Sequence, residues 1–173
     1  NDKNNFFKDE LKIKNFGYSI YDFSDLSKKK INKETHIQLP YNILMVPDYK
    51  SLSYLKKNKC KIIARSVFMR GYLYKDINLI IKKFKFLKTI RNDLIKICNV
   101  TKLKLAEISF LYTLIQKNVD YVILGIESEK ELNYNLKLIN KKNINSVKSI
   151  KNLIQKITKY TKKNAKNLDM RKV

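Results

Sequence analysis

Cys60-Lys61-Ile62-Ile63-Ala64-Arg65-Ser66-Val67-Phe68-Met69-Arg70-Gly71 is an apolar run that turns polar at Arg65 and Ser66 and closes with a glycine. The β-branched residues Ile62 and Ile63 predict a strand that is buried on both faces. A buried strand that becomes polar only at its carboxyl end is typical of α/β folds that present a site there. A plain core strand with a solvated exit loop would look the same, but the pattern occurs four times along the chain, which favours a site.

The three other strands are short segments that each end in a turn or in polar residues, and we predict them over residues 13–20, 36–42 and 120–124. Gly17 interrupts the first strand, which indicates a close approach of another backbone or of a ligand. The strand over 36–42 contains Gln38, and the strand over 120–124 ends at Gly125. His36, the only histidine, lies at the start of its strand, away from the expected site, so we assign it no catalytic or metal-binding role.

Apolar residues at helical spacing fill the intervals between these strands and extend beyond the last one. They predict helices over residues 48–58, 76–98, 102–116 (capped by Thr101), 129–139 and 146–160, followed by a solvated tail over 161–173. Ser128 and Glu131 form a capping box at the start of the fourth helix. A strand, a glycine and a capped helix together form an arrangement suited to anions. The repeated strand–helix units predict parallel, right-handed connections within a single domain over residues 1–173.

Length and cysteine content narrow the class of protein further. The 173 residues suffice for one domain but not for a complete eightfold barrel of roughly 250 residues. The sequence starts with Asn1 rather than Met, so we expect a truncated start. Cys60 and Cys98 are isolated thiols without metal-ligand spacing, and no apolar run is long enough to span a membrane. We therefore expect a cytoplasmic protein without a bound metal and without membrane contact.

The net charge of +23 raises the question of nucleic-acid binding. The basic residues are almost all lysines spread through every segment, and arginine occurs only at positions 65, 70, 91 and 171. A dedicated nucleic-acid binder more often clusters arginines and interleaves them with aromatic residues. We therefore expect no nucleic-acid partner, although a non-catalytic basic binding module is kept as the alternative function.

Four motifs, taken in order, resemble the aldo/keto reductases. They are Phe16-Gly17-Tyr18-Ser19-Ile20-Tyr21, Ile37-Gln38-Leu39-Pro40-Tyr41-Asn42, Ala64-Arg65-Ser66-Val67-Phe68-Met69-Arg70-Gly71 and Val122-Ile123-Leu124-Gly125, followed by Leu132 and Asn135. The similarity covers residues 11–140 and implies an α/β fold, a partial (β/α)8 TIM barrel. Its four βα units would correspond to strands five to eight of the family's barrel, with residues after 140 supplying a C-terminal helix.

The resemblance also implies a site for a nicotinamide dinucleotide, NAD(P)H. Ser19 and Gln38 would hold the carboxamide, and Arg65, Ser66 and Phe68 would support the nicotinamide ring and the pyrophosphate. Many members stack a tyrosine on that ring where this chain has Arg65. The adenosine end would be held by Gly125, Ile126, Ser128 and Asn135, and Tyr134 replaces the acidic residue usual before that asparagine. Glu127 in the same loop favours NAD over NADP, because a carboxylate repels a 2′-phosphate and accepts a hydrogen bond from a free ribose hydroxyl.

The family's catalytic Asp, Tyr, Lys and His lie in the first four units of its barrel, and no position here matches them. This leaves two alternatives, a truncated start or a half-barrel that has taken another role. We expect the chain to supply the cofactor-binding half of an oxidoreductase that reduces a small carbonyl substrate to an alcohol. Alone it should lack the proton donor, which contributes on the order of 10²–10⁴-fold to such reactions. A half-barrel also leaves two sheet edges unpaired, so the isolated chain is expected to self-associate.

Overall fold

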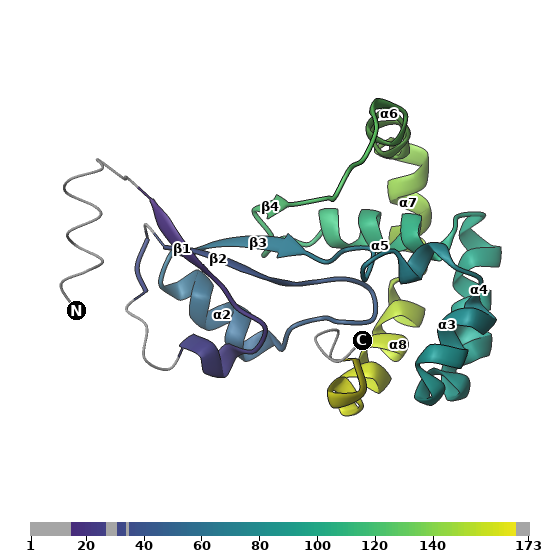
Figure 1. Cartoon of the computed structure of the whole chain (residues 1–173), viewed down its shortest axis with the longest axis horizontal. Coiled ribbons are helices and arrows are strands. Elements are labelled where there is room, and N and C mark those ends of the chain that lie inside the picture. The colour runs from purple at the N-terminus through teal and green to yellow at the C-terminus, as the bar shows by residue number, and fades with distance from the viewer. Residues whose placement is uncertain (1–14, 27–30, 34, 169–173) are drawn as a thin grey trace.

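The computed structural model describes residues 15–26, 31–33 and 35–168, except for the side chain of Asn167. Its sheet has four parallel strands in the order in which they occur along the chain (Figure 1). They are β1 (Phe16–Ser19), β2 (Thr35–Pro40), β3 (Lys61–Arg65) and β4 (Tyr121–Val122). The predicted α/β class with parallel strands is thereby confirmed.

The two faces of the sheet differ in burial. One face packs on helices and carries fully buried residues such as Ile37, Ile62 and Ala64. The opposite face, called here the open face, is partly exposed; register places Ser19, Gln38, Ile63 and Tyr121 in one row across it. The prediction that β3 is buried on both faces is therefore wrong, because Ile63 is only half-buried.

Gly17 is required by the contact between β1 and β2. A Cβ atom at this position would lie 2.1 Å from the backbone oxygen of His36, its partner in the register. This close approach of two backbones confirms the interpretation of the glycine inside the first strand.

Helical segments separate the strands, although only a short 3₁₀ turn is described between β1 and β2 and three α-helices lie between β3 and β4. The α-helices are α2 (Tyr49–Lys57), α3 (Ile77–Lys83), α4 (Arg91–Thr101), α5 (Leu105–Leu114), α6 (Glu129–Leu138), α7 (Lys141–Ser149) and α8 (Lys151–Lys163). Short 3₁₀ turns occur at η1 (Phe23–Leu26), η2 (Tyr72–Tyr74), η3 (Lys85–Ile90) and η4 (Ala165–Leu168). In Figure 1 α6 stands apart at the top of the view, while α3 and α4 lie at the far right.

Several predicted boundaries need correction. The single helix predicted over 76–98 is divided into α3, η3 and α4, because the backbone leaves helical geometry at Phe84 (φ −114°, ψ 73°). Thr101 ends α4 instead of capping α5: its hydroxyl donates to Ile97 O at 2.7 Å, and Lys102 adopts a left-handed conformation. The helix predicted over 146–160 is divided at Ile150 into α7 and α8.

The C-terminal residues also differ from their prediction. Thr161 and Leu168 are each 1 % exposed, so the tail predicted to be solvated from residue 161 is packed on the core as far as Leu168. Residues 169–173 lie outside the described part. The larger of two apolar clusters joins α3, α4, α5, α7 and α8. The smaller one lies between the sheet and α2.

Candidate functional site

Ser19 and Gln38 meet on the open face at the carboxyl ends of β1 and β2. They are register partners, and the Ser19 hydroxyl donates to Gln38 Oε1 at 2.9 Å. Ser19 is exposed and Gln38 is half-buried, so the pair presents a hydroxyl and an amide to whatever lies over this face. Two polar side chains fixed against each other in this way can orient a ligand that carries both a donor and an acceptor.

Arg65 ends β3 beside this pair. Its guanidinium spans the edge of the sheet: Nη2 donates to Ile20 O at 3.0 Å and Nη1 donates to Ser66 Oγ at 3.1 Å. The Cζ atom lies 5.6 Å from the centre of the Tyr21 ring, and Nε is buried without a partner. Burial lowers the pKa of Arg65, and the nearby charge of Arg70 lowers it further. The guanidinium still carries its charge, because its ordinary pKa is far above neutrality.

The loop after β3 is built from left-handed backbone. Ser66 (φ 56°), Met69 (φ 48°), Arg70 (φ 53°) and Gly71 (φ 80°) all have positive φ. Such conformations are costly for residues other than glycine and persist only where the surroundings hold them. Here the buried side chains below the loop do so: Asn42 Nδ2 donates to Ser66 O at 3.0 Å, and Ser109 Oγ donates to Val67 O at 2.8 Å.

A groove of about 630 Å³ lies between this loop and the segment that joins β4 to α6. It gathers five of the predicted site residues, namely Ser66, Phe68, Gly125, Ile126 and Glu127, together with Arg70, Tyr74 and Glu131. Phe68 forms part of its floor, since its ring is 9 % exposed and packs on Tyr74 and Phe110 at centroid distances of 4.9 and 6.2 Å. A Cβ atom added to Gly125 would meet no atom within 4 Å, so the groove is open at that point.

Ser128 begins α6, as the capping box predicts: its hydroxyl accepts from Glu131 N at 3.2 Å. The Glu131 carboxylate accepts from Glu127 N at 3.1 Å instead of from the Ser128 amide. Ser128 therefore shapes the loop without lining the groove. Of the acidic side chains here, Glu131 is used to fold the loop, whereas Glu127 is exposed along the groove.

Asn135 lies one helical turn beyond Glu131 and is 2 % exposed. Neither its Oδ1 nor its Nδ2 has a hydrogen-bond partner. Beside it, the Tyr134 hydroxyl donates to the buried carboxylate of Glu107, which also accepts from Lys104 N at 2.8 Å. The hydrogen bond with Glu107 raises the pKa of Tyr134 to about 12. Glu107 of α5 thus places a carboxylate next to α6. Its partner there, Tyr134, is the tyrosine that replaces the acidic residue usual before the family's asparagine.

The structure arranges the predicted residues in two main groups at the carboxyl ends of the strands. Ser19 and Gln38 form the first, the groove forms the second, and Arg65 connects the two through its hydrogen bonds to Ile20 and Ser66. Asn135 is separate from the groove lining, on the following turn of α6.

The residues that help to build this site but were not predicted include Tyr21 under the Arg65 guanidinium, Asn42 under Ser66, and Arg70 and Tyr74 in the groove wall. Tyr21, Asn42 and Arg70 lie within three of the four motifs, so the sequence marked their positions. It did not indicate which contacts they make. Tyr74 lies three residues after Gly71, which ends the third motif, and no pattern marks it.

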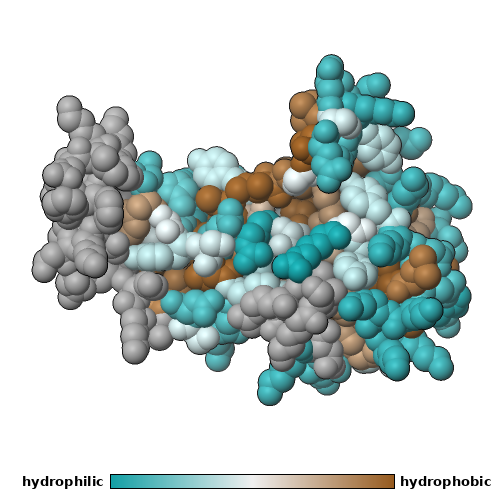
Figure 2. All heavy atoms as spheres, viewed as in Figure 1, coloured by the Kyte–Doolittle hydropathy of each residue, from teal (hydrophilic) through white to brown (hydrophobic). Residues whose placement is uncertain are grey.

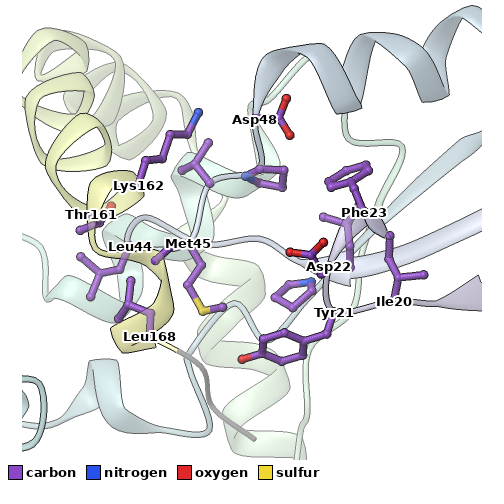
Figure 3. Close-up of a pocket in the computed structure, with 15 residues that line it drawn as sticks. Ile20, Tyr21, Asp22, Phe23, Leu44, Met45, Asp48, Thr161, Lys162 and Leu168 are labelled. Atoms are coloured by element: carbon purple, nitrogen blue, oxygen red, sulfur yellow. The ribbon is translucent and has the colours of Figure 1, made fainter. Parts of the chain in front are cut away.

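A second cavity of about 330 Å³ lies at the ends of β1 and β2 (Figure 3). Figure 3 shows Tyr21, Asp22 and Phe23 facing Leu44 and Met45 across it, with Thr161, Lys162 and Leu168 closing it from α8 and η4. None of the predicted site residues lines this cavity. Its wall takes Ile20, Tyr21, Leu39 and Pro40 from the carboxyl ends of β1 and β2, so the cavity lies beyond the strand ends rather than over Ser19 and Gln38.

A metal site, a reactive thiol, a catalytic histidine or a membrane-spanning helix would each indicate another function. Across 15–26, 31–33 and 35–168, no group of three His, Cys, Asp or Glu side chains is placed to hold a metal ion. The thiols of Cys60 and Cys98 are free, and burial raises the pKa of both. His36 stacks on Tyr121 with ring centroids 6.4 Å apart, at the end of β2 opposite the site. None of the helices in the described part is long and apolar enough to cross a membrane.

The aldo/keto reductase family model matches residues 6–155. Because this match covers most of the chain, the chain belongs to the aldo/keto reductase family. No curated protein matches it individually.

Two solved structures are similar to the chain. The holo form of the aldo-keto reductase AKR11C1 from Bacillus halodurans shares 18 % sequence identity with a TM-score of 0.59, over 84 % of this chain and 53 % of that one. The thermostable aldo-keto reductase Tm1743, in complex with the inhibitor epalrestat, shares 19 % identity with a TM-score of 0.49, over 84 % of this chain and 52 % of that one. The first similarity supports the fold alone, and the chain spans about half the length of both proteins.

Proposed function

We propose that this chain supplies the nicotinamide-dinucleotide-binding half of an NAD(P)-dependent oxidoreductase that reduces a carbonyl to an alcohol. Its strands β1 to β4 would correspond to the fifth to eighth strands of the family's barrel, within one domain. One observation carries the proposal: the Ser19–Gln38 pair and the groove lie at the same end of the sheet, where the strands have their carboxyl ends, and Arg65 joins them.

The residues present fit a dinucleotide. Ser19 and Gln38 offer the donor and acceptor that a carboxamide needs, and Arg65 and Ser66 come next along the edge. Arg70 lines the groove and supplies positive charge for a pyrophosphate. Asn135, one turn of α6 beyond the groove, has a buried amide without a hydrogen-bond partner, and the family resemblance assigns this position to the adenosine end. When bound, the cofactor supplies a hydride; these residues bind and orient it.

The proton donor for carbonyl reduction does not come from these residues. Tyr18, Tyr21 and Tyr41 match no catalytic position of the family, and burial raises the pKa of Tyr41 well above its ordinary value. We propose that the donor and its partners belong to a part of the enzyme outside this sequence, and that the enzyme works in the cytosol, where thiols such as Cys60 and Cys98 stay reduced.

Titration calorimetry of the 173-residue chain with NADH and NADPH tests the proposal. We expect saturable binding of at least one of them. Gln38→Ala should weaken it about tenfold, because a hydrogen bond of about 1–1.5 kcal/mol is lost. Gln155→Ala on the exposed side of α8 is the matched control and should change nothing. An absence of binding, or equal effects of the two substitutions, would contradict the proposal.

A further inference from the structure

Arg65 is a half-buried cation without a carboxylate partner in the part of the chain that the structure describes. Its hydrogen bonds go to neutral groups, the Ile20 carbonyl and the Ser66 hydroxyl, and Nε is buried without a partner. The charged side chain that lowers its pKa is a second cation, Arg70, whereas the Tyr21 hydroxyl acts in the opposite direction. A positive charge held in this way faces its surroundings with its field uncompensated.

The register of β2 and β3 places the charge of Arg65 beside the Ser19–Gln38 pair. Gln38 is the partner of Ile63, and Pro40 is the partner of Arg65, two residues further toward the carboxyl end. Side chains two residues apart on a strand point to the same face. Arg65 therefore stands on the open face, one step beyond Ser19 and Gln38, and its plane lies over the Tyr21 ring at 5.6 Å.

We propose that Arg65 makes this site distinguish the oxidation states of its cofactor, holding the reduced, neutral nicotinamide ring more tightly than the oxidised, cationic one. The inference rests on the proposed function, because it requires the nicotinamide end to lie at the Ser19–Gln38 pair. It adds a specificity that a stacked tyrosine at this position would not confer.

The physical reason is the repulsion between like charges. A guanidinium is flat and stacks on rings as an aromatic side chain does, so Arg65 can support a neutral dihydronicotinamide without loss of contact. Against an oxidised ring the same group brings two positive charges together in a region of reduced dielectric constant. For a half-buried pair, screening leaves an effect of about tenfold in relative affinity.

A preference for the reduced ring favours one direction of the reaction. A site that prefers the reduced ring is filled by NAD(P)H even when the oxidised form is present, and it releases the oxidised form readily after hydride transfer. This behaviour suits carbonyl reduction rather than alcohol oxidation, and it comes from this half of the enzyme alone.

The test is a set of dissociation constants for NADH, NAD⁺, NADPH and NADP⁺, measured by calorimetry on the full chain. Wild type should bind each reduced form about tenfold more tightly than its oxidised counterpart. Arg65→Met should remove most of this ratio by strengthening the oxidised form, whereas Arg65→Lys, which keeps the charge, should preserve it. Arg70→Met is the matched control: since Arg70 lines the groove, its loss should weaken both oxidation states by a similar factor.

The inference is overturned if wild type binds the oxidised forms as tightly as the reduced ones. It is also overturned if Arg65→Met weakens both forms equally, which would place Arg65 against a phosphate. If wild type binds none of the four dinucleotides, the proposed function fails together with the inference, so the two failures are distinguishable. If Arg65→Met does not fold, the wild-type ratio and the Arg65→Lys variant still decide the question.

Discussion

Arg65 and Asn135 are the residues with buried side-chain nitrogen or oxygen atoms that lack a hydrogen-bond partner in the described part of the chain. Leaving such an atom unpaired costs about 1–3 kcal/mol, so native structures contain few of them. Both belong to the site proposed for the dinucleotide. We interpret them as groups whose partner is the ligand, which makes the site less stable when it is empty.

This interpretation predicts opposite effects of Asn135→Leu on stability and on binding. Leucine has a similar volume and no polar atoms to leave unpaired, so the free energy of unfolding should rise by about 1 kcal/mol. Dinucleotide affinity should fall about tenfold at the same time. Urea unfolding and calorimetric titration of one preparation measure the two quantities.

Asn133→Leu is the control, since Asn133 is exposed on the same helix. It should change neither quantity by much. A loss of stability in Asn135→Leu would contradict this interpretation, because it would show that the Asn135 amide has a partner within the protein.

Glu127 determines the expected choice between NADH and NADPH. It is exposed and lines the groove, whereas the Glu131 carboxylate is occupied by the Glu127 amide. Glu127→Arg should raise the affinity for NADPH relative to NADH about tenfold, because a guanidinium pairs with the 2′-phosphate that a carboxylate repels.

Glu129→Arg provides the comparison, since Glu129 is exposed in the first turn of α6 but does not line the groove. It should leave the ratio unchanged. If wild type already prefers NADPH tenfold, the role assigned to Glu127 is wrong.

At the scale of elements, Asp120 adds side-chain bonds to the backbone pairing of β4 with β3. Its backbone N–H donates to Ile62 O at 2.9 Å, and its carboxylate accepts from Ile62 N at 2.9 Å and from the ammonium groups of Lys56 and Lys61. Burial alone would raise the pKa of Asp120, but the hydrogen bond from Ile62 and the two lysines outweigh it, so the pKa is lowered.

We expect Asp120→Asn to reduce the free energy of unfolding by about 1–2 kcal/mol at neutral pH. A carboxyl whose pKa is lowered by folding stabilises the protein above its unfolded pKa of about 3.9 and loses this contribution as pH falls through its folded value. The difference between variant and wild type should therefore shrink in that acid range. Urea unfolding at several pH values measures it.

Asp93→Asn serves as the control for Asp120, because Asp93 pairs with the largely exposed Lys156 and should contribute less than about 1 kcal/mol. A difference for Asp120→Asn that stays constant down to pH 3 would show that its charge is not the cause.

The elements that the sequence predicts well are those whose local signal agrees with their packing. The strands around Gln38 and Ala64 and the start of α6 at Ser128 are of this kind. The division of 76–98 could not be predicted, since its apolar spacing continues across Phe84 and no proline or glycine interrupts it. Similarly, β4 is shorter than its apolar run because its pairing with β3 ends at Val122.

In the site, too, some features could be predicted from the sequence and others could not. Resemblance to a family could place Ser19, Gln38 and Asn135, because they occupy motif positions. It could not place the Arg65 guanidinium on the Ile20 carbonyl, since that contact joins strands that are not neighbours in the sheet. The burial of Asn135 without a partner also depends on packing between helices, which no local pattern encodes.

At the scale of the whole molecule, the sheet has two edges: β1 and β4 each pair with one neighbour in the described structure. Apolar side chains are exposed near β4, including Tyr121 (53 %) and Ile123 (47 %). Figure 2 shows hydrophobic surface along the segment from β4 to α6 and on the adjoining side of α6. Unpaired edges with apolar surroundings pair with other chains, so we expect the isolated chain to self-associate.

Sedimentation at tens of micromolar, a concentration at which exposed edges associate, should show species larger than the monomer. Tyr121→Lys should shift the distribution toward monomer by placing a charge at the β4 edge, whereas Tyr49→Lys on α2, where the tyrosine is 80 % exposed, should not. A compact monomer for wild type would contradict the expectation.

We propose that the dinucleotide lies at the carboxyl ends of the strands, and hydrogen–deuterium exchange of the chain with and without NADPH or NADH is the measurement that tests this proposal most directly. We expect slower exchange in two segments, 64–74 after β3 and 123–135 through the start of α6, which form the groove and carry Asn135. Slower exchange confined to residues 20–23 and 44–48, around the cavity of Figure 3, would place the ligand elsewhere and contradict the account. Exchange that is unchanged everywhere at saturating dinucleotide would contradict it equally.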